Sequence, residues 1–266
     1  MSAARRRERT RMLRLIASDL DGTLLDENER LPEGIFELID ALSAKGITFV
    51  PASGRQLANV RRLFAPVWRK LCVICEGGAL VMRGEERIAS FPLQQDCIEE
   101  IIDDIRAAGD MELLLSAQDT CYLLDNDRRY VDDILYRLRN NVAILDDPLA
   151  CRDEYIKIAA YRASGVGALA PALREKWKGR VHVELGGSQW LDFTLGNKGV
   201  ALEALGRHLN IAPCDMAAFG DQSNDLSMLS LVGRPYLMRS ADPALRTKRT
   251  TLCDDVMRDI RALCGL

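Results

Sequence analysis

Two carboxylates, Asp19 and Asp21, follow a mostly apolar segment from Leu13 to Ser18 and precede a glycine. Such a segment is typical of a strand that is buried on both faces of a parallel sheet. Residues at positions i and i+2 lie on the same side of an extended chain, and open α/β sheets bind ligands beyond the carboxyl ends of their strands. The spacing therefore predicts a pair of carboxylates at a ligand-binding edge. The alternative is that Asp and Gly only shape the turn after the strand.

Three further polar groups stand where other predicted elements end or begin. Ser53, Gly54 and Arg55 follow a predicted strand over 47–51, and Lys198 opens a predicted helix. Clustered carboxylates repel one another unless a cation is present, and an all-oxygen site of this kind suits Mg²⁺. A lysine and a hydroxyl beside such a site suit a phosphate group. The third group follows a predicted strand over 216–219 and consists of Gly220, Asp221, Gln222, Ser223, Asn224 and Asp225.

In this order, these groups resemble the four motifs of the haloacid dehalogenase (HAD) superfamily. The motifs are Asp-x-Asp-Gly-Thr, Ser-Gly-Arg, Lys-Gly and Gly-Asp-x-x-Asn-Asp, and the similarity extends from about Leu13 to Leu231. A large segment inserted between the second and third motifs is similar to the cap of the Cof-type branch. The resemblance implies a Mg²⁺-dependent phosphatase that hydrolyses small phosphomonoesters, such as sugar phosphates or related metabolites, through an aspartyl-phosphate.

The resemblance also implies a role for each motif residue. Asp19 would be the nucleophile, and Asp21 would be the general acid and then the base. The implied metal ligands are Asp19, Asp221, the backbone carbonyl of Asp21, and Asp225, which would act through water or orient Lys198. The residues implied to bind the phosphoryl group are Ser53, Gly54, Lys198 and Asn224.

The sequence offers only candidates for contacts with the part of the substrate beyond the phosphoryl group. Arg55 is a candidate for the substrate or the cap, with a surface salt bridge as the alternative. Glu76 stands where the Cof-type branch usually has Asn, so we expect it either to face away or to bind a cationic part of the substrate. Candidates in the cap are Tyr122, Tyr161, Arg162 and Trp190.

The elements around these motifs predict an α/β fold, with a Rossmann-like parallel-sheet core domain and an inserted α+β cap domain. Strands over 13–18, 47–51 and 71–75 alternate with helices over 31–42 and 57–63, which is the pattern of a parallel sheet with crossover helices. The pattern resumes after residue 197 and closes with a helix over 254–263. We expect the core to comprise residues 1–84 and 193–266, and the cap to comprise residues 85–192, where a hairpin over 79–91 leads into further strands and helices.

Composition narrows the class of protein. The formal net charge of the 266 residues is −3, so the charge gives no indication of a nucleic-acid partner. The longest stretch without a charged residue has 11 residues, from Ala163 to Leu173, which is too short to span a membrane. Eight scattered cysteines predict reduced thiols in a cytoplasmic protein. We interpret six arginines within residues 1–14 as a solvated basic tail, and we leave monomer or homodimer open.

Three alternative functions compete with the phosphatase hypothesis. Gly165-Val166-Gly167-Ala168-Leu169-Ala170 fits a dinucleotide-binding pattern between a strand and a helix. A phosphomutase could use the same aspartyl-phosphate chemistry. A catalytically silent protein could bind a phosphorylated metabolite with the same residues, although Asp19, Asp21, Lys198 and Asp221 all have the types that catalysis needs.

Overall fold

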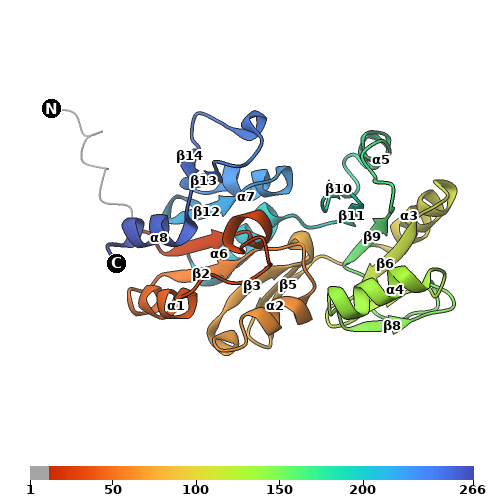
Figure 1. The fold of residues 1–266 in the computed structure, drawn as a ribbon, viewed down its shortest axis with the longest axis horizontal. Coiled ribbons are helices and arrows are strands. Elements are labelled where there is room, and N and C mark those ends of the chain that lie inside the picture. The colour runs from red at the N-terminus through yellow and green to blue at the C-terminus, as the bar shows by residue number, and fades with distance from the viewer. Residues whose placement is uncertain (1–11) are drawn as a thin grey trace.

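A computed structural model describes residues 12–266 of the chain. The arginine-rich tail, except for Arg14, therefore lies outside the described residues. Figure 1 shows two parts side by side, and the chain passes from the first part to the second and back. No helix in the described part is both long enough and apolar enough to cross a membrane.

A five-stranded parallel sheet forms the centre of the first part. Its order is β14-β13-β12-β1-β2, and every neighbouring pair is parallel. The strand bounds are β1 Leu15–Ser18, β2 Thr48–Pro51, β12 Met216–Gly220, β13 Arg234–Met238 and β14 Thr251–Cys253. The first strand lies between β12 and β2, so Asp19 emerges next to the ends of both neighbours. This confirms the predicted parallel-sheet fold class.

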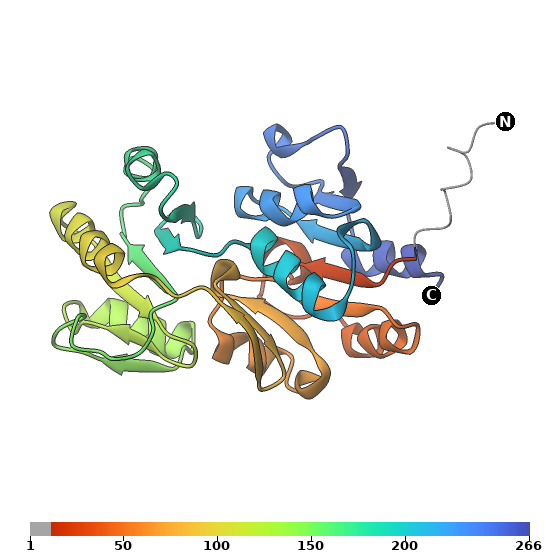
Figure 2. The same cartoon turned by 180° about the vertical axis from the view of Figure 1, so that it is seen from behind.

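Helices cover both faces of this sheet (Figures 1 and 2). The reason is the alternation of side chains along buried strands: Ile16 packs on one face, while Leu15 and Ala17 pack on the other. The first face carries α1, α2 and α8, and the opposite face carries α6 and α7. Their bounds are α1 Ile35–Ala44, α2 Leu57–Leu63, α6 Lys198–Leu209, α7 Leu226–Leu231 and α8 Val256–Cys264.

A second, antiparallel sheet continues from β2. It has the order β3-β4-β5, with β3 at Cys72–Cys75, β4 at Leu80–Arg83 and β5 at Glu86–Ser90. We expected the strand over 71–75 to extend the parallel sheet, but only one parallel bridge, from Ala52 to Ile74, joins it to the end of β2. The backbone amide of residue 51 faces β3, since Ala52 donates to β1 and Ser53 donates to Ile74. That residue is Pro51, which has no N–H, so the ladder is interrupted there.

The second part of the chain is a six-stranded sheet with the order β10-β11-β9-β6-β7-β8. Its strands are β6 Glu112–Ser116, β7 Cys121–Leu123, β8 Val142–Ile144, β9 Lys157–Tyr161, β10 His182–Leu185 and β11 Trp190–Thr194. Its helices are α3 Gln95–Ala107, α4 Arg128–Asp132, which continues as a π-helical turn over Asp133–Arg137, and α5 Ala170–Trp177. The predicted domain boundaries fall in the β4–β5 turn and within β11, and they remain predictions.

The glycine-rich segment before α5 connects β9 to this helix in the second part of the chain. The strand that precedes it, β9, is antiparallel to both of its neighbours, β6 and β11. In a dinucleotide-binding unit the helix joins parallel strands that are neighbours in the sheet. Here β10, the strand after α5, is separated from β9 by β11, which is antiparallel to both. The surrounding topology therefore contradicts the dinucleotide-binding alternative.

Candidate active site

The turn after β1 presents both aspartates of the first motif. Asp19 is the first residue beyond the strand and is buried, whereas Asp21 lies on the exposed side of the turn. Gly22 has φ +83°, and a Cβ at this position would lie 2.5 Å from Oδ2 of Asp221. Glycine therefore permits both the left-handed backbone and the close approach of the β12 loop. The hydroxyl of Thr23 donates to Oδ1 of Asp221 at 2.9 Å and joins the two loops.

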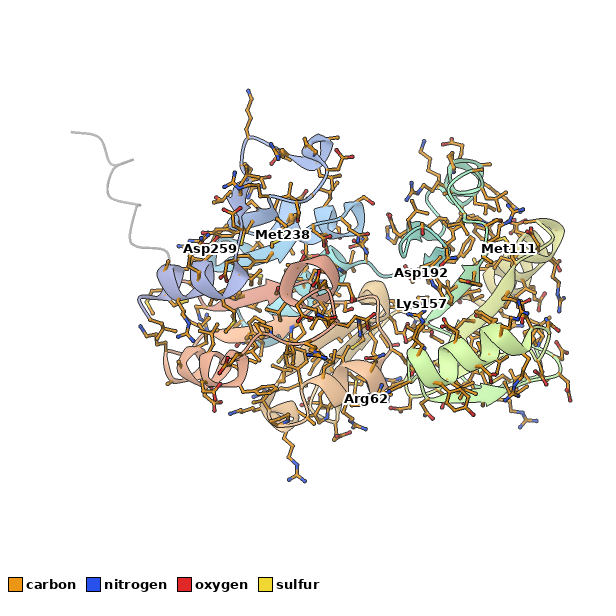
Figure 3. The ribbon with its side chains drawn as sticks, in the orientation of Figure 1. Arg62, Met111, Lys157, Asp192, Met238 and Asp259 are labelled. Atoms are coloured by element: carbon orange, nitrogen blue, oxygen red, sulfur yellow. The ribbon has the colours of Figure 1, made fainter. Side chains whose placement is uncertain are left out.

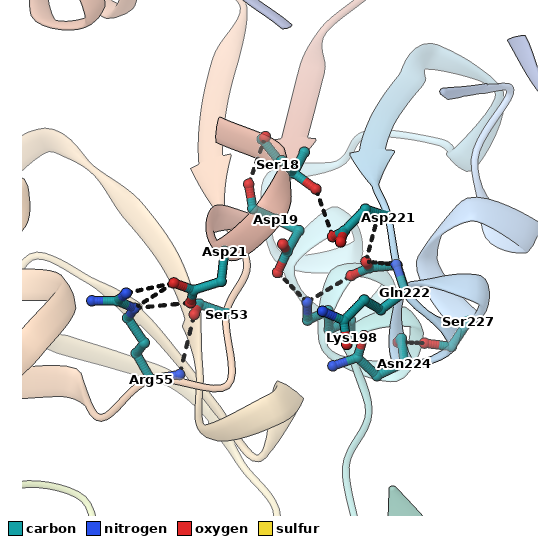
Figure 4. A network of polar contacts seen from close by, with 12 residues as sticks. Ser18, Asp19, Asp21, Ser53, Arg55, Lys198, Asp221, Gln222, Asn224 and Ser227 are labelled. Carbon is teal, nitrogen blue, oxygen red and sulfur yellow. Dashed lines mark hydrogen bonds and ion pairs between the residues drawn. The ribbon is translucent and has the colours of Figure 1, made fainter. Parts of the chain in front are cut away.

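Lys198 enters the site from the first turn of α6. The side chain of Asn197 caps this helix by accepting a hydrogen bond from the amide of Val200 at 2.9 Å. The buried ammonium of Lys198 lies 2.5 Å from Oδ1 of Asp19 and 2.6 Å from Oδ1 of Asp225 (Figure 4). It therefore joins the ends of β1 and β12 through charge-assisted hydrogen bonds.

Asp225 holds the loop after β12 in place. Its Oδ2 accepts hydrogen bonds from the backbone amides of Asp221 at 2.9 Å and Gln222 at 3.0 Å, while its Oδ1 receives the Lys198 ammonium. Both carboxylate oxygens of this fully buried residue are thus engaged. This geometry fits the expected role of orienting Lys198.

Burial dominates the electrostatics of these groups. It raises the pKa of Asp19 to about 8, against the opposing effect of the Lys198 ammonium. Burial also raises the pKa of Asp221, against the hydrogen bond from Thr23. For Lys198, burial alone would lower the pKa, but Asp19 and Asp225 outweigh it and raise the pKa well above its ordinary value. With Lys198 alone beside them, the charged forms of Asp19 and Asp221 are therefore disfavoured, and a further cation would favour them.

The three aspartates fit a divalent cation. One oxygen from each of Asp19, Asp221 and Asp225 can be chosen such that all three lie within 4.8 Å of one another. In addition, Oδ1 of Asn224 is buried and accepts no hydrogen bond from the described residues. A hard cation with oxygen ligands and bound water would meet both needs, and Mg²⁺ has that preference.

Arg55 pairs with Asp21 on the other side of the turn. Its Nε donates to Oδ2 of Asp21 at 2.9 Å, and its Nη2 also contacts Oδ1 (Figure 4). The same Nη2 lies 2.8 Å from Glu29, and the backbone amide of Arg55 donates to Oγ of Ser53 at 3.1 Å. The guanidinium thus orients Asp21 at the edge of the site.

A cavity of about 370 Å³ connects these residues with the second part of the chain. Seven of the predicted site residues line it, while Ser53, Lys198 and Asp225 are buried and do not. Of the cap candidates, Trp190 lines the cavity, whereas Tyr122, Tyr161 and Arg162 do not. The seven lining residues are Asp19, Asp21, Gly54, Arg55, Glu76, Asp221 and Asn224.

The structure adds three residues of the six-stranded sheet that the sequence analysis did not identify. They are Ser116 on β6, Lys157 on β9 and Asp192 on β11, and all three line the cavity beside Glu76. A signal was present, because Lys157 and Asp192 interrupt otherwise apolar strands, where charged residues are rarely buried without a partner. Glu76, the partner of Lys157, is distant in the chain, so no local spacing in the sequence indicates that the two residues pair.

Known proteins are similar to this chain in sequence and in fold. The family model of the haloacid dehalogenase-like hydrolases matches residues 16–259. An HMP-PP phosphatase of Cronobacter sakazakii is 28% identical over 250 residues, which cover 88% of this chain and 87% of the relative. A phosphoglycolate phosphatase of Methanoculleus marisnigri is 28% identical over 234 residues, or 86% of each chain. A solved haloacid dehalogenase-like hydrolase of B. subtilis has a TM-score of 0.80 at 21% identity and covers 95% of this chain and 99% of its own.

A parallel sheet with an acidic cluster at its carboxyl edge is the arrangement of an α/β protein that binds its ligand at that edge. The chain belongs to the haloacid dehalogenase-like hydrolase family. This confirms the resemblance found in its motifs and the prediction of a phosphoric monoester hydrolase.

Proposed function

We propose that the chain hydrolyses small phosphomonoesters with Mg²⁺, through an aspartyl-phosphate on Asp19. One observation carries the proposal: the Lys198 ammonium is buried between Asp19 and Asp225, and Asp221 lies close enough to share a cation with both aspartates. A buried lysine beside clustered carboxylates can neutralise the charge of a phosphoryl group.

Asp19 is the nucleophile of the proposed reaction. Its carboxylate attacks phosphorus in line with the ester oxygen, so that a new O–P bond forms as the bond to the leaving oxygen breaks. Asp21 donates its proton to that oxygen, and the alcohol leaves. Asp21 then removes a proton from water, which attacks phosphorus and releases inorganic phosphate and the free Asp19 carboxylate.

The remaining motif residues bind the phosphoryl group. Lys198 and the hydroxyl of Ser53 provide positive charge and a hydrogen bond for its oxygens, and Gly54 lines the cavity without a side chain. Asp19, Asp221, Asp225 and the backbone carbonyl of Asp21 would hold the metal ion, directly or through water. When bound, Mg²⁺ supplies charge neutralisation for the phosphoryl oxygens.

The size of the cavity and the names of the relatives both support a small metabolite as substrate. A cavity of about 370 Å³ is at the small end of the range for ligand pockets. The relatives include an HMP-PP phosphatase and a phosphoglycolate phosphatase. A cytoplasmic location is consistent with eight cysteines that are all free.

Phosphate release from p-nitrophenyl phosphate tests the proposed function. We expect hydrolysis that requires Mg²⁺ and that falls by at least about 10³-fold in Asp19→Asn, because the amide cannot act as nucleophile. The matched control is Asp40→Asn. Asp40 lies on α1, and its carboxylate forms an exposed ion pair with Lys70. Hydrolysis that survives in Asp19→Asn, or that does not respond to Mg²⁺, would contradict the mechanism.

A further inference from the structure

A second cluster of charged residues lies where the two parts of the chain meet, and Figure 3 labels two of its members, Lys157 and Asp192. The Nζ atom of Lys157 is 2.5 Å from Oε2 of Glu76 and 3.6 Å from Oδ2 of Asp192. It also donates to the backbone carbonyl of Gly54 at 3.0 Å, and Ser116 donates its hydroxyl to Oε2 of Glu76 at 3.2 Å. These residues line the same cavity as Asp19 and Asp21.

This cluster has more acceptors than donors. The Lys157 ammonium contacts Oε2 of Glu76 and donates to the carbonyl of Gly54, while its contact with Asp192 at 3.6 Å is an ion pair that is too long for a hydrogen bond. The second oxygen of Glu76, Oε1, accepts no hydrogen bond from any described residue, although the side chain is only 1% exposed. A buried carboxylate oxygen without a donor costs free energy, and a ligand that brings a donor would recover it.

The charge balance points the same way. Seven charged side chains line the cavity, five of them acidic. Arg55 is paired with Asp21, while Asp19 and Asp221 belong to the proposed metal site with Lys198 behind them. Glu76 and Asp192 then share the single charge of Lys157. This part of the cavity therefore has one negative charge more than its own residues balance.

The backbone fixes Glu76 in this position. The turn Glu76–Gly78 begins where β3 ends, and Glu76 has the left-handed φ of +52°. Gly78 packs so closely on the start of α6 that a Cβ would lie 2.6 Å from the amide nitrogen of Lys198. The turn Glu76–Gly78 therefore packs directly on the first turn of α6, which carries Lys198.

We propose that Glu76 and Asp192 form a specificity subsite for an amino or ammonium group on the organic part of the phosphomonoester. This inference rests on the proposed phosphatase function and adds a substrate class to it. The ligand's N–H groups donate to Oε1 of Glu76 and to the carboxylate of Asp192, and its positive charge balances the cluster. Trp190, two residues before Asp192 on β11, lines the cavity with an aromatic ring, which also attracts cations.

Matched substrates test the subsite. The first pair is glucosamine 6-phosphate and glucose 6-phosphate, and the second is pyridoxamine 5′-phosphate and pyridoxine 5′-phosphate. Within each pair only an amine replaces a hydroxyl group. We expect the parent protein to favour the amine by about tenfold or more in kcat/KM for at least one pair. In Glu76→Gln, which keeps the size of the side chain and removes its charge, the ratio of amine to hydroxyl should fall to about one.

The ratio separates this inference from a purely structural role. If Glu76 only joins the two parts of the chain, Glu76→Gln lowers both members of a pair equally and leaves the ratio unchanged, which overturns the inference. A parent ratio near one for both pairs overturns it as well. Should Glu76→Gln fail to fold, Glu76→Asn serves instead, since Asn tolerates a left-handed φ. The control is Glu100→Gln. This carboxylate pairs with Arg180 at 2.7 Å and does not line the cavity, so the variant should keep the parent ratio.

The proposed function is judged separately by p-nitrophenyl phosphate, which has no amine. Mg²⁺-dependent hydrolysis of this substrate that is lost in Asp19→Asn, together with ratios near one, would leave the phosphatase function intact and remove only the subsite. A parent protein that hydrolyses no phosphomonoester would remove both.

Discussion

Lys198 is the single residue on which the arrangement of the active site depends most. Its ammonium is the one cation of the described residues in direct contact with Asp19 and Asp225, and both contacts are buried. Breaking a buried pair by removing one partner leaves an uncompensated charge. The Lys198 side chain therefore both positions the carboxylates of Asp19 and Asp225 and stabilises the fold around them.

The sequence predicted the residues of the four motifs but not most of their partners. Short spacings such as Asp19 and Asp21 are visible because the periodicity of a strand relates neighbours in the chain. The contact between Glu76 and Lys157 joins residues 81 positions apart, so no local pattern encodes it. The sequence also gave two interpretations of Arg55, and only the folded chain shows that it pairs with Asp21.

Arg55→Lys tests whether this guanidinium positions Asp21. The planar fork contacts Asp21 through Nε and Nη2 together, and an ammonium cannot reproduce that geometry. We expect kcat for p-nitrophenyl phosphate to fall by about 10- to 100-fold, because Asp21 would lose its orientation toward the leaving oxygen. Arg61→Lys, in an exposed pair with Glu85, is the control and should retain the parent rate. An unchanged kcat in Arg55→Lys would show that Asp21 needs no such support.

At the scale of elements, continuous apolar patterns were predicted well, whereas two short strands at the edges of the sheets were not. The buried stripe of α1 and the run of β1 are continuous enough to be read from the sequence. In contrast, β8 and β14 have three residues each, too few for a period to appear. The pairing of β3 also differed, because Pro51 interrupts the hydrogen bonds on that side of β2.

The turn Glu76–Gly78 allows a paired test of how elements position the site. Gly77 has φ +68° with open space around its Cβ direction, so Gly77→Ala should cost only backbone strain, about 1 kcal/mol. Gly78 has φ +106° and packs on Asn197 and Lys198. Gly78→Ala should therefore cost several-fold more stability and should also reduce kcat by displacing the start of α6. Thermal melts and p-nitrophenyl phosphate assays check both effects.

Equal effects of the two substitutions would contradict this account. In that case the left-handed backbone alone, and not the contact with α6, would set the need for glycine in the turn.

At the scale of the whole molecule, contacts across the two parts of the chain complete the cavity. The side chain of Gln56 exchanges two hydrogen bonds with the backbone of Asn141, at 3.1 and 2.7 Å, and Asn59 donates to the carbonyl of Leu138 at 2.6 Å. Lys157 adds a buried ion pair to Glu76. The motif order predicted an inserted cap, but which cap residues meet the core depends on packing over long distances in the chain.

Lys157→Met tests the energetic role of this junction. The change leaves Glu76 and Asp192 buried without their cation, so we expect a loss of about 3–5 kcal/mol near neutral pH, seen as a lower Tm. Burial raises the pKa of both carboxyls, with Lys157 as the opposing influence, and its removal should raise them further. In the unfolded chain both carboxyls have ordinary pKa values, so the folded variant takes up protons first as the pH falls. The Tm deficit relative to the parent should therefore be smaller at pH 5.5 than at pH 7.5.

The control for this experiment is Lys178→Met, which removes an exposed partner of Glu175 and should change Tm little at either pH. A deficit in Lys157→Met that is the same at both pH values would mean that the variant loses only packing. The penalty then could not arise from two uncompensated carboxylates, and the surplus of negative charge on which the amine subsite depends would have to be abandoned with it.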